Sequence, residues 1–300
     1  MTAERQQISG FALWQWRSIT QKQAIEAGMS PQEVDWLLRE VAGLDRLSLR
    51  LESFKTQPEV LLSCSLETLA HLWQQRLDAR VPVQYLAGIA PWRQFVLRVS
   101  PAVLIPRPET EYLIDLALSV VERNPELALG NWADLGTGSG AIAIGLASAL
   151  PHALLHAVDL SESALSIARE NAAANGLSDR IQFYQGSWFE PLTALQGQLS
   201  GIVSNPPYIP SQLIPDLQPE VSRHEPHLAL DGGADGLDDI RQLVSIAPRY
   251  LRSGGVWMIE MMAGQAMQVS QLLQQQGSYR EIQIYADFAG LDRFALAYRQ

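Results

Sequence analysis

The chain has 300 residues, 47% of them hydrophobic, so it can bury one large core together with a smaller one. Its formal net charge is −10, and residues 81–300 carry nine of those negative charges. Such a domain has no general attraction for a phosphate backbone, which argues against functions that require tight, direct nucleic-acid binding.

Cysteine content and the amino-terminal segment limit the cellular setting. The chain has one cysteine, Cys64, which excludes a disulfide framework and a cysteine-rich metal site. The first residues lack the charged-then-apolar pattern of a secretion signal, and no apolar run reaches the length of a membrane-spanning helix. We therefore expect a cytoplasmic protein that does not associate with membranes.

Helical patterns dominate residues 10–78. One helical run covers residues 14–27, a second begins near Ser30 and a third begins at Ser65. Together these runs predict a small helical domain over residues 1–80.

The second of these helices has a clear start signal. Ser30 stands at the N-cap, Pro31 at the first helical position and Glu33 at the capping-box position. Apolar residues then recur on one helical face, which predicts an amphipathic helix that packs against its neighbours. That face consists of Val34, Leu37, Leu38 and Val41.

Residues 81–105 differ from the helical segment before them. Pro82, Pro91 and Pro101 separate β-rich pieces of sequence, as in a hairpin. We therefore place a β-hairpin-like connector over this segment and a large domain over residues 106–300.

The large domain follows an alternating pattern. From Asn131 onward, short apolar runs alternate with helical runs, which predicts a parallel sheet with right-handed crossovers. Residues 280–300 break the alternation, because two strand-like runs lie on either side of a short glycine-containing turn. The predicted fold is α/β, a Rossmann-like sheet with a terminal antiparallel hairpin, preceded by the small helical domain.

A glycine-rich loop lies between a predicted strand and an apolar helix. Glycines permit a tight strand-to-helix turn and let a ligand approach the backbone, while the helix amino terminus can offer N–H groups. A nucleotide-like or zwitterionic ligand fits this description. The loop consists of Gly136, Thr137, Gly138, Ser139 and Gly140.

This loop does not by itself identify its ligand. With Ala141 as its last position it satisfies the dinucleotide fingerprint, and Asp159 lies 19 residues after Gly140, at the end of the next strand. A carboxylate there can accept both hydroxyls of an unphosphorylated ribose, which argues against NADP but leaves NAD and S-adenosylmethionine open. Trp188 follows another strand, where it could stack on an adenine or be a partly buried aromatic without that role.

A short apolar run that ends at Ser204 is followed by the tetrapeptide NPPY. Its two prolines remove two backbone donors and fix two φ angles, so the segment cannot continue as a central strand. Ligands of open α/β sheets lie beyond the carboxyl ends of the strands, so this tetrapeptide should face the same crevice as Asp159 and the glycine loop. It consists of Asn205, Pro206, Pro207 and Tyr208.

Several motifs together resemble one known family. DLGTGSG, VDLS and SNPPY form the signature series of class I S-adenosylmethionine-dependent amino methyltransferases. PVQYLAG, LIPRPETEYLID, EPHLALDGGADGL and DFAGLDRF resemble the release factor glutamine methyltransferases, the HemK/PrmC family. The resemblance extends over nearly the whole chain, including the helical domain. It departs from the family pattern after Glu260, where Met261 and Met262 stand in a region expected to hold a glycine.

The resemblance implies methyl transfer from S-adenosylmethionine to the side-chain amide nitrogen (N5) of the glutamine in the Gly-Gly-Gln loop of class 1 peptide chain release factors. It implies that the glycine loop, Asp159, Trp188 and Asn205 contact this cofactor. At the tetrapeptide, the Asn205 side-chain oxygen and the Pro206 carbonyl can each accept one N–H of the target amide. The two prolines hold these acceptors rigid, and Tyr208 offers a flat face for the planar amide.

Alternative functions remain open at this point. An adenine-N6 methyltransferase acting on nucleic acid would present the same tetrapeptide, because adenine also carries a planar NH₂. An NAD-dependent dehydrogenase and a non-catalytic cofactor-binding module are permitted by the glycine loop but leave the tetrapeptide unexplained. We expect a monomer whose partner is a release factor, with no stable nucleic-acid binding, and a thermal-shift panel would separate the dehydrogenase from the methyltransferases.

Two further sequence features are weaker indications of a binding site. Arg107, Glu109 and Glu111 precede a helix, where they either contact the ligand or serve as ordinary helix-start residues. His224 and His227 have H-x-x-H spacing but no nearby third ligand, so we expect no metal site.

Overall fold

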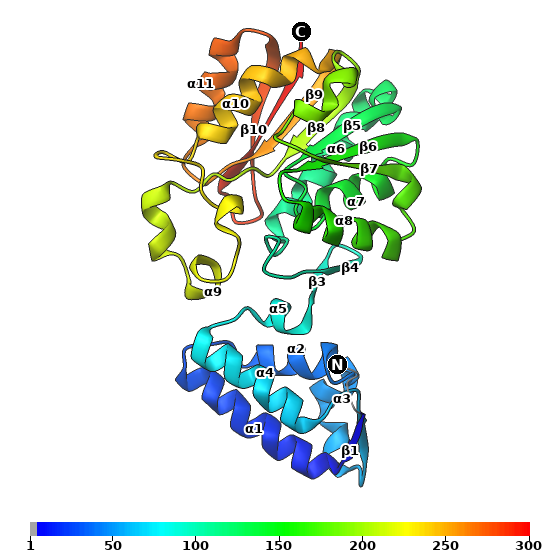
Figure 1. The fold of residues 1–300 in the computed structure, drawn as a ribbon, viewed down its shortest axis with the longest axis vertical. Helices are drawn as coiled ribbons and strands as arrows, with labels where there is room; N and C mark the ends of the chain where they lie inside the picture. The colour runs from blue at the N-terminus through cyan, green and yellow to red at the C-terminus, as the bar shows by residue number, and fades with distance from the viewer. Residues whose placement is uncertain (1–4) are drawn as a thin grey trace. The chain divides into compact units, whose positions relative to one another are not determined.

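The computed structural model describes residues 5–300, and the chain divides into two compact units, one that ends at Gly88 and a second that comprises Ile89–Gln300 (Figure 1). The division falls within residues 81–105, the segment expected to form a connector. Its first part forms a short helix of the first unit, and the hairpin formed by its later part opens the second unit.

The first unit is a small helical domain with its own hydrophobic core around Leu13, Leu37 and Trp73. Its strands β1 and β2 pair antiparallel, a feature that the helical pattern of the sequence does not predict. Its elements are β1 (Gln6–Ile8), α1 (Gly10–Glu26), α2 (Gln32–Glu40), α3 (Arg46–Leu51), β2 (Val60–Leu62), α4 (Leu66–Ala79) and α5 (Val83–Ala87).

The start of α2 differs from the expected capping box. The helix begins at Gln32 with Pro31 as its N-cap, so the Ser30 hydroxyl accepts from the Gln32 amide at 3.3 Å instead of capping one turn later. The Glu33 carboxylate binds the Arg76 guanidinium of α4, with Nε at 2.6 Å. The predicted capping box is therefore wrong, because the Glu33 carboxylate forms a tertiary ion pair with Arg76. The expected helix start at Ser65 is confirmed, since Ser65 is the N-cap of α4 and its hydroxyl accepts from the Thr68 amide at 3.0 Å.

The second unit contains a seven-stranded sheet in the order β10-β11-β9-β8-β5-β6-β7. Strands β7, β6, β5, β8 and β9 run parallel to one another, and β11 pairs antiparallel with both β9 and β10. The predicted Rossmann-like α/β fold and its terminal antiparallel hairpin are therefore confirmed.

The elements of this unit are β3 (Ile89–Trp92), β4 (Phe95–Arg98), α6 (Tyr112–Arg123), β5 (Gly130–Leu135), α7 (Ala141–Ala149), β6 (Ala153–Asp159), α8 (Glu162–Ala174), β7 (Ile181–Gln185), β8 (Leu199–Ser204), α9 (Pro219–Ser222), α10 (Asp238–Ile246), β9 (Leu251–Glu260), α11 (Ala266–Gln276), β10 (Tyr279–Ala286) and β11 (Asp292–Arg299). Short 3-10 helices lie between them and in the first unit: η1 (Ser53–Thr56), η2 (Glu109–Glu111), η3 (Pro125–Ala128), η4 (Ser178–Arg180), η5 (Glu190–Leu195), η6 (Ser211–Asp216), η7 (His227–Ala229) and η8 (Ala247–Arg249).

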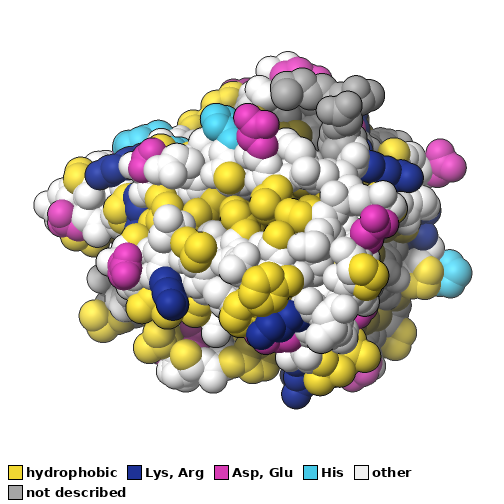
Figure 2. Space-filling model, turned by 90° about the horizontal axis from the view of Figure 1, so that it is seen from below, with side chains coloured by type: hydrophobic (Ala, Val, Ile, Leu, Met, Phe, Trp, Pro, Cys, Tyr) yellow, Lys and Arg dark blue, Asp and Glu magenta, His cyan; other side chains and the backbone are white. Residues whose placement is uncertain are grey.

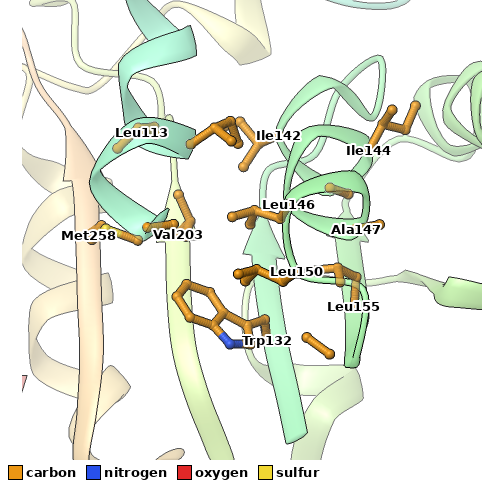
Figure 3. Packing of buried hydrophobic residues seen from close by; sticks show 14 of the residues in the cluster. Leu113, Trp132, Ile142, Ile144, Leu146, Ala147, Leu150, Leu155, Val203 and Met258 are labelled. Carbon is orange, nitrogen blue, oxygen red and sulfur yellow. The ribbon is translucent and has the colours of Figure 1, made fainter. Parts of the chain in front are cut away.

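Helices cover both faces of the sheet, which explains why its central strands are almost continuously apolar. Helices α6, α7 and α8 pack on one face, and α10 and α11 pack on the other (Figure 1). On the first face, Trp132 of β5 packs among side chains that include Leu150 and Val203 (Figure 3). A Cβ at Gly201 of β8 would lie 2.4 Å from the Trp132 ring, so this pair of strands needs a glycine there.

The order of the strands places several loops at one edge of the sheet. The chain passes from β5 outward to β6 and β7 and then returns to β8 on the other side of β5. At such a reversal the loops that follow neighbouring strands separate and leave a crevice beyond their carboxyl ends. Asp159 is the last residue of β6 at this edge, and the glycine loop, Trp188 and the NPPY tetrapeptide follow strands there.

A buried histidine in β6 links stability to pH. His156 is only 3% exposed, and its ring nitrogens lie 3.0 Å from Asn131 Oδ1 and 3.0 Å from the Tyr184 hydroxyl. Burial disfavours the charged imidazolium and lowers the pKa of His156 to about 4.

Because His156 titrates near 6.5 in an unfolded chain, the unfolded state takes up a proton that the folded state excludes as pH falls. The free energy of unfolding should therefore decrease between pH 6.5 and pH 4. In His156→Gln this decrease should be smaller by about 1–3 kcal/mol, as measured by urea denaturation across that range. Parallel pH profiles for the two proteins would contradict the assignment.

Candidate functional site

The second unit contains a cavity of about 450 Å³ at the carboxyl edge of the sheet. Its wall combines loops that follow β5, β6, β7 and β8 with the segment before α6 and the long segment between β8 and α10. The lining includes Arg107, Thr110, Gly136, Thr137, Gly138, Ser139, Asp159, Trp188, Asn205, Pro207, Asp231, Asp239 and Gln242. The sheet reversal therefore brings Asp159, Trp188 and Asn205 around one cavity with four of the five expected glycine-loop residues; Gly140, the fifth, does not line it.

The glycine loop adopts backbone conformations that favour glycine. Gly136, Gly138 and Gly140 have φ angles of 78°, 54° and 85°, and Gly140 is the N-cap of α7. A Cβ at Gly140 would lie 3.1 Å from the Ala168 Cβ, so this glycine also lets α7 and α8 approach each other.

Two carboxylates hold the glycine loop in place. Asp134 is fully buried beneath it, and its Oδ2 accepts from the Thr137 hydroxyl at 2.6 Å. Desolvation raises the pKa of Asp134 to about 7. Asp159 Oδ2 accepts from the Gly138 amide at 2.8 Å, and its Oδ1 accepts from the Ser161 amide at 2.9 Å. Burial raises the pKa of Asp159 as well, while these amides lower it.

Trp188 lies directly against the glycine loop. Its own φ is 48°, and a Cβ at Gly136 would approach its ring to 3.2 Å. Burial raises the pKa of the Asp239 carboxyl group, and the neighbouring Trp188 indole opposes that rise. Both side chains line the cavity, which gives one end of it a flat aromatic surface next to a hydrogen-bond acceptor. Asp239 has no counterpart in the sequence prediction, because no local motif marks it.

The NPPY tetrapeptide begins where β8 ends, at Ser204. Asn205 and Pro207 line the cavity, and Pro206 is buried. The Asn205 Nδ2 donates to the Thr110 hydroxyl at 3.2 Å. The Tyr208 hydroxyl points away from solvent and donates to Glu260 Oε1 at 3.1 Å. The tetrapeptide is therefore anchored by side chains from two distant parts of the chain.

The sequence patterns assign no role to Thr110 or Glu260, the two residues that anchor the tetrapeptide. Glu260 is the last residue of β9 and is 1% exposed; desolvation raises its pKa to about 7. Its Oε2 accepts from the Thr110 hydroxyl at 2.7 Å. Burial, together with the nearby Glu260 carboxylate, raises the pKa of Tyr208 above its ordinary value. Thr110 lies within the motif IPRPETEY, between the charged residues Glu109 and Glu111.

The charged residues of that motif divide between two roles. Arg107 lines the cavity and binds the Glu225 carboxylate at 2.7 Å, and this carboxyl group is almost completely buried. Burial raises the pKa of Glu225, and the nearby Arg107 opposes that rise. Glu111 turns away to accept from the Arg93 amide at 2.9 Å. The Arg107–Glu225 pair ties the segment before α6 to the segment after α9, and both border the cavity.

Metal-ligand clusters and membrane-spanning helices are two features not found in the described part of the chain. Across residues 5–300, no group of three or more His, Cys, Asp or Glu side chains is arranged to hold a metal ion. Among the same residues, no helix is long and apolar enough to cross a membrane. The cavity itself is lined by an indole ring together with carboxylate, amide and hydroxyl side chains.

Sequence comparisons agree with this arrangement. A family model described as "Methyltransferase small domain" matches residues 115–216. A "Release factor glutamine methyltransferase" of Synechocystis sp. is 50% identical over 97% of this chain and 97% of its own length. Proteins of the same description from Thermosynechococcus vestitus and Gloeobacter violaceus are 47% and 45% identical, over 97% and 94% of this chain and 99% and 96% of their own lengths.

The chain belongs to the release factor glutamine methyltransferase family. This confirms the resemblance that the sequence motifs indicate, over the helical unit as well as the sheet. Met261 and Met262, which stand where a glycine was expected after Glu260, do not disturb the strand pairing there, because Met261 is buried and its amide donates to the Arg293 carbonyl at 2.9 Å.

Solved structures support the fold assignment. The hMettl16 catalytic domain, solved in complex with a MAT2A 3'UTR hairpin, aligns with a TM-score of 0.54 and 16% identity over 77% of this chain and 80% of that chain. A "delta-N METTL16 MTase domain" aligns with a TM-score of 0.50 and 17% identity over 78% of this chain and 95% of that one. At this level of identity the likeness shows a shared methyltransferase fold.

The Arg107–Glu225 pair should stabilise the segment that closes one side of the cavity. Replacing Glu225 by alanine removes the buried partner of Arg107, so residues 219–231 should open more often. Amide hydrogen exchange of peptides from this segment should become about tenfold faster, as measured by mass spectrometry. Glu162→Ala, which removes an exposed ion pair with Arg169, is the control. Unchanged exchange in Glu225→Ala would show that the pair does not hold the segment.

Proposed function

We propose that this protein transfers the methyl group of S-adenosylmethionine to the side-chain amide nitrogen of the glutamine in the Gly-Gly-Gln loop of class 1 peptide chain release factors. The observation that carries the proposal is the position of Asn205, which lies on the wall of the same cavity as the glycine loop and Asp159. Membership of the release factor glutamine methyltransferase family selects the amide of a protein over the amine of a nucleic-acid base.

The cavity has the groups that S-adenosylmethionine requires. Asp159 lines it and can accept the ribose hydroxyls, and the Trp188 ring offers a stacking surface for adenine beside the Asp239 carboxylate. The absence of a side chain at Gly136 keeps the Trp188 ring uncrowded, because a Cβ at Gly136 would lie 3.2 Å from that ring. The volume of the cavity lies in the usual range for small-molecule sites. When bound, this cofactor supplies a methyl group that its sulfonium has already activated.

The protein's own contribution is to orient a weak nucleophile. The lone pair of an amide nitrogen is delocalised into the carbonyl, so the target needs alignment more than a strong base. Asn205 Oδ1 and the Pro206 carbonyl can each accept one N–H of the target NH₂. Correct positioning of reactants lowers a barrier by on the order of 7–11 kcal/mol, against about 1 kcal/mol for one neutral hydrogen bond. Rigid prolines at 206 and 207 keep this rim in position before the substrate arrives.

We propose that the helical unit recognises the release factor outside its glutamine loop. Exposed hydrophobic side chains on α1 support this role, because Phe11, Ile19 and Ile25 are 53%, 59% and 62% exposed. On the face drawn in Figure 2, Lys and Arg side chains lie singly among hydrophobic, acidic and uncharged ones. Such a surface suits a protein partner better than a phosphate backbone.

The substrate can be tested with labelled S-adenosylmethionine and three acceptors: an intact class 1 release factor, a short peptide that contains its Gly-Gly-Gln sequence, and duplex DNA. Label should enter the release factor at the glutamine side chain, as located by mass spectrometry. The peptide should have a much higher KM than the intact protein, because it lacks contacts for the helical unit. Label in DNA alone would contradict the proposed substrate, and equal KM values would contradict the role of the helical unit.

Two variants separate catalysis from cofactor binding. Asn205→Ala should lower kcat by about 100-fold or more, because the target amide loses an orienting acceptor, while calorimetry should show substantial remaining affinity for S-adenosylmethionine. Asp159→Ala should instead raise the Kd for S-adenosylmethionine about 10- to 100-fold, since hydrogen bonds to a charged group are lost. Asp179→Ala, an exposed carboxylate in η4, is the matched control. An unchanged kcat in Asn205→Ala would remove that residue from the mechanism.

A further inference from the structure

A continuous chain of side-chain hydrogen bonds runs from the tetrapeptide to a buried carboxylate. Asn205 Nδ2 donates to Thr110 Oγ1 at 3.2 Å, and Thr110 Oγ1 donates to Glu260 Oε2 at 2.7 Å. The other carboxylate oxygen, Glu260 Oε1, accepts from the Tyr208 hydroxyl at 3.1 Å. Thr110 and Glu260 are 4% and 1% exposed, so water does not compete for these bonds. The two ends of this chain are the first and last residues of NPPY.

The chemistry of each group sets the direction of the chain. An ionised carboxylate can only accept, so Glu260 takes the single hydroxyl proton of Thr110. The Thr110 oxygen is then left with lone pairs, and the Asn205 amide must turn its NH₂ toward them. Asn205 Oδ1 consequently remains available at the cavity wall, which Asn205 lines.

We propose that Thr110 and Glu260 are positioning residues of the methyl transfer: they hold the Asn205 amide so that its oxygen, and not its nitrogen, meets the substrate. The inference rests on the proposed function, because that function needs an acceptor for an N–H of the target amide. The hydrogen bond from Tyr208 to Glu260 holds the other end of the tetrapeptide.

This orientation also discriminates between substrates. A fixed carbonyl oxygen attracts an NH₂ and repels a carbonyl or carboxylate oxygen, which has no proton to donate. A glutamine can therefore bind with its nitrogen toward the methyl donor, while a glutamate or a flipped amide leaves Asn205 Oδ1 facing an oxygen. If Asn205 could rotate freely, its NH₂ would accommodate the wrong end of the substrate equally well.

Charged groups from several elements surround Glu260. Arg293 of β11 favours its ionised form, although that guanidinium is already paired with Asp287 at 2.8 Å. Desolvation favours the protonated form, as to a smaller extent does Glu109 of η2, and the pKa of Glu260 reaches about 7. A protonated Glu260 can donate to Thr110, whose hydroxyl could then donate to Asn205 Oδ1 and reverse the amide. The rate should therefore fall as pH drops below about 7.

The first test measures kcat on the intact release factor. Thr110→Val keeps the shape of the side chain but removes the hydroxyl, and it should lower kcat by about 10- to 100-fold. Thr110→Ser restores the hydroxyl and should return kcat to within a few-fold of the unmodified protein. Thr193→Val in η5, an exposed position, is the matched control and should change nothing. The Kd for S-adenosylmethionine should stay within a few-fold in all three variants.

The second test is the pH profile of kcat. The unmodified protein should lose rate as pH falls through the pKa of Glu260, and Glu260→Gln should be slower at pH 8 and lack this limb. A purely structural role for Glu260 would lower the amount of folded protein without removing the limb. The inference is overturned if Thr110→Val keeps its kcat or if the acidic limb persists unchanged in Glu260→Gln.

A third readout does not use the substrate. In protein labelled with ¹⁵N-asparagine, the Asn205 side-chain NH₂ signal, assigned by its loss in Asn205→Ala, should exchange slowly with water. Thr110→Val should make that exchange much faster, while Thr193→Val should not. An unaffected Asn205 signal would refute the network even if transfer to the release factor failed. Absence of transfer by the unmodified protein would refute only the proposed function, because this readout judges the network separately.

Discussion

The contact between Trp132 and the backbone of Gly201 holds together the two central strands on which the site depends. A Cβ at position 201 would lie 2.4 Å from the indole, so β5 and β8 can adopt their register only with a glycine there. These strands flank the reversal of the sheet. Because the glycine loop follows one of them and NPPY follows the other, their pairing determines the distance between the proposed cofactor site and the proposed substrate site.

Buried carboxylates organise the loops above that pair of strands. Asp134 holds Thr137 from below, Asp159 holds the Gly138 amide, and Glu260 holds Thr110 together with Tyr208. Burying a charge is unfavourable, and the raised pKa of each group reflects that cost. Hydrogen bonds from the loops offset part of it. The same negative field suits a ligand with a positive sulfonium, as in the function proposed for this cavity.

Much of the architecture could be predicted from local sequence patterns. Alternating apolar and helical runs indicated the parallel sheet, and the glycine turn near the end of the chain indicated the terminal hairpin, because both depend on periodicity and turn chemistry. The predicted capping box at Ser30 was wrong, since Glu33 pairs with Arg76, which lies 43 residues further along the chain. The pairing of β1 with β2 was also missed, because each strand has three residues and carries little pattern.

The sequence by itself determined which chemistry-bearing residues follow the strands: the glycine loop, Asp159, Trp188 and NPPY, each a local feature whose place in an α/β sheet follows from topology rules. Only the tertiary structure decided what supports them. Thr110 and Glu260 lie 150 residues apart, and Arg107 and Glu225 lie 118 residues apart. No local pattern marks such pairs, because a buried threonine or glutamate acquires its partner only when β9 pairs with β8 and the segment before α6 packs over the sheet edge.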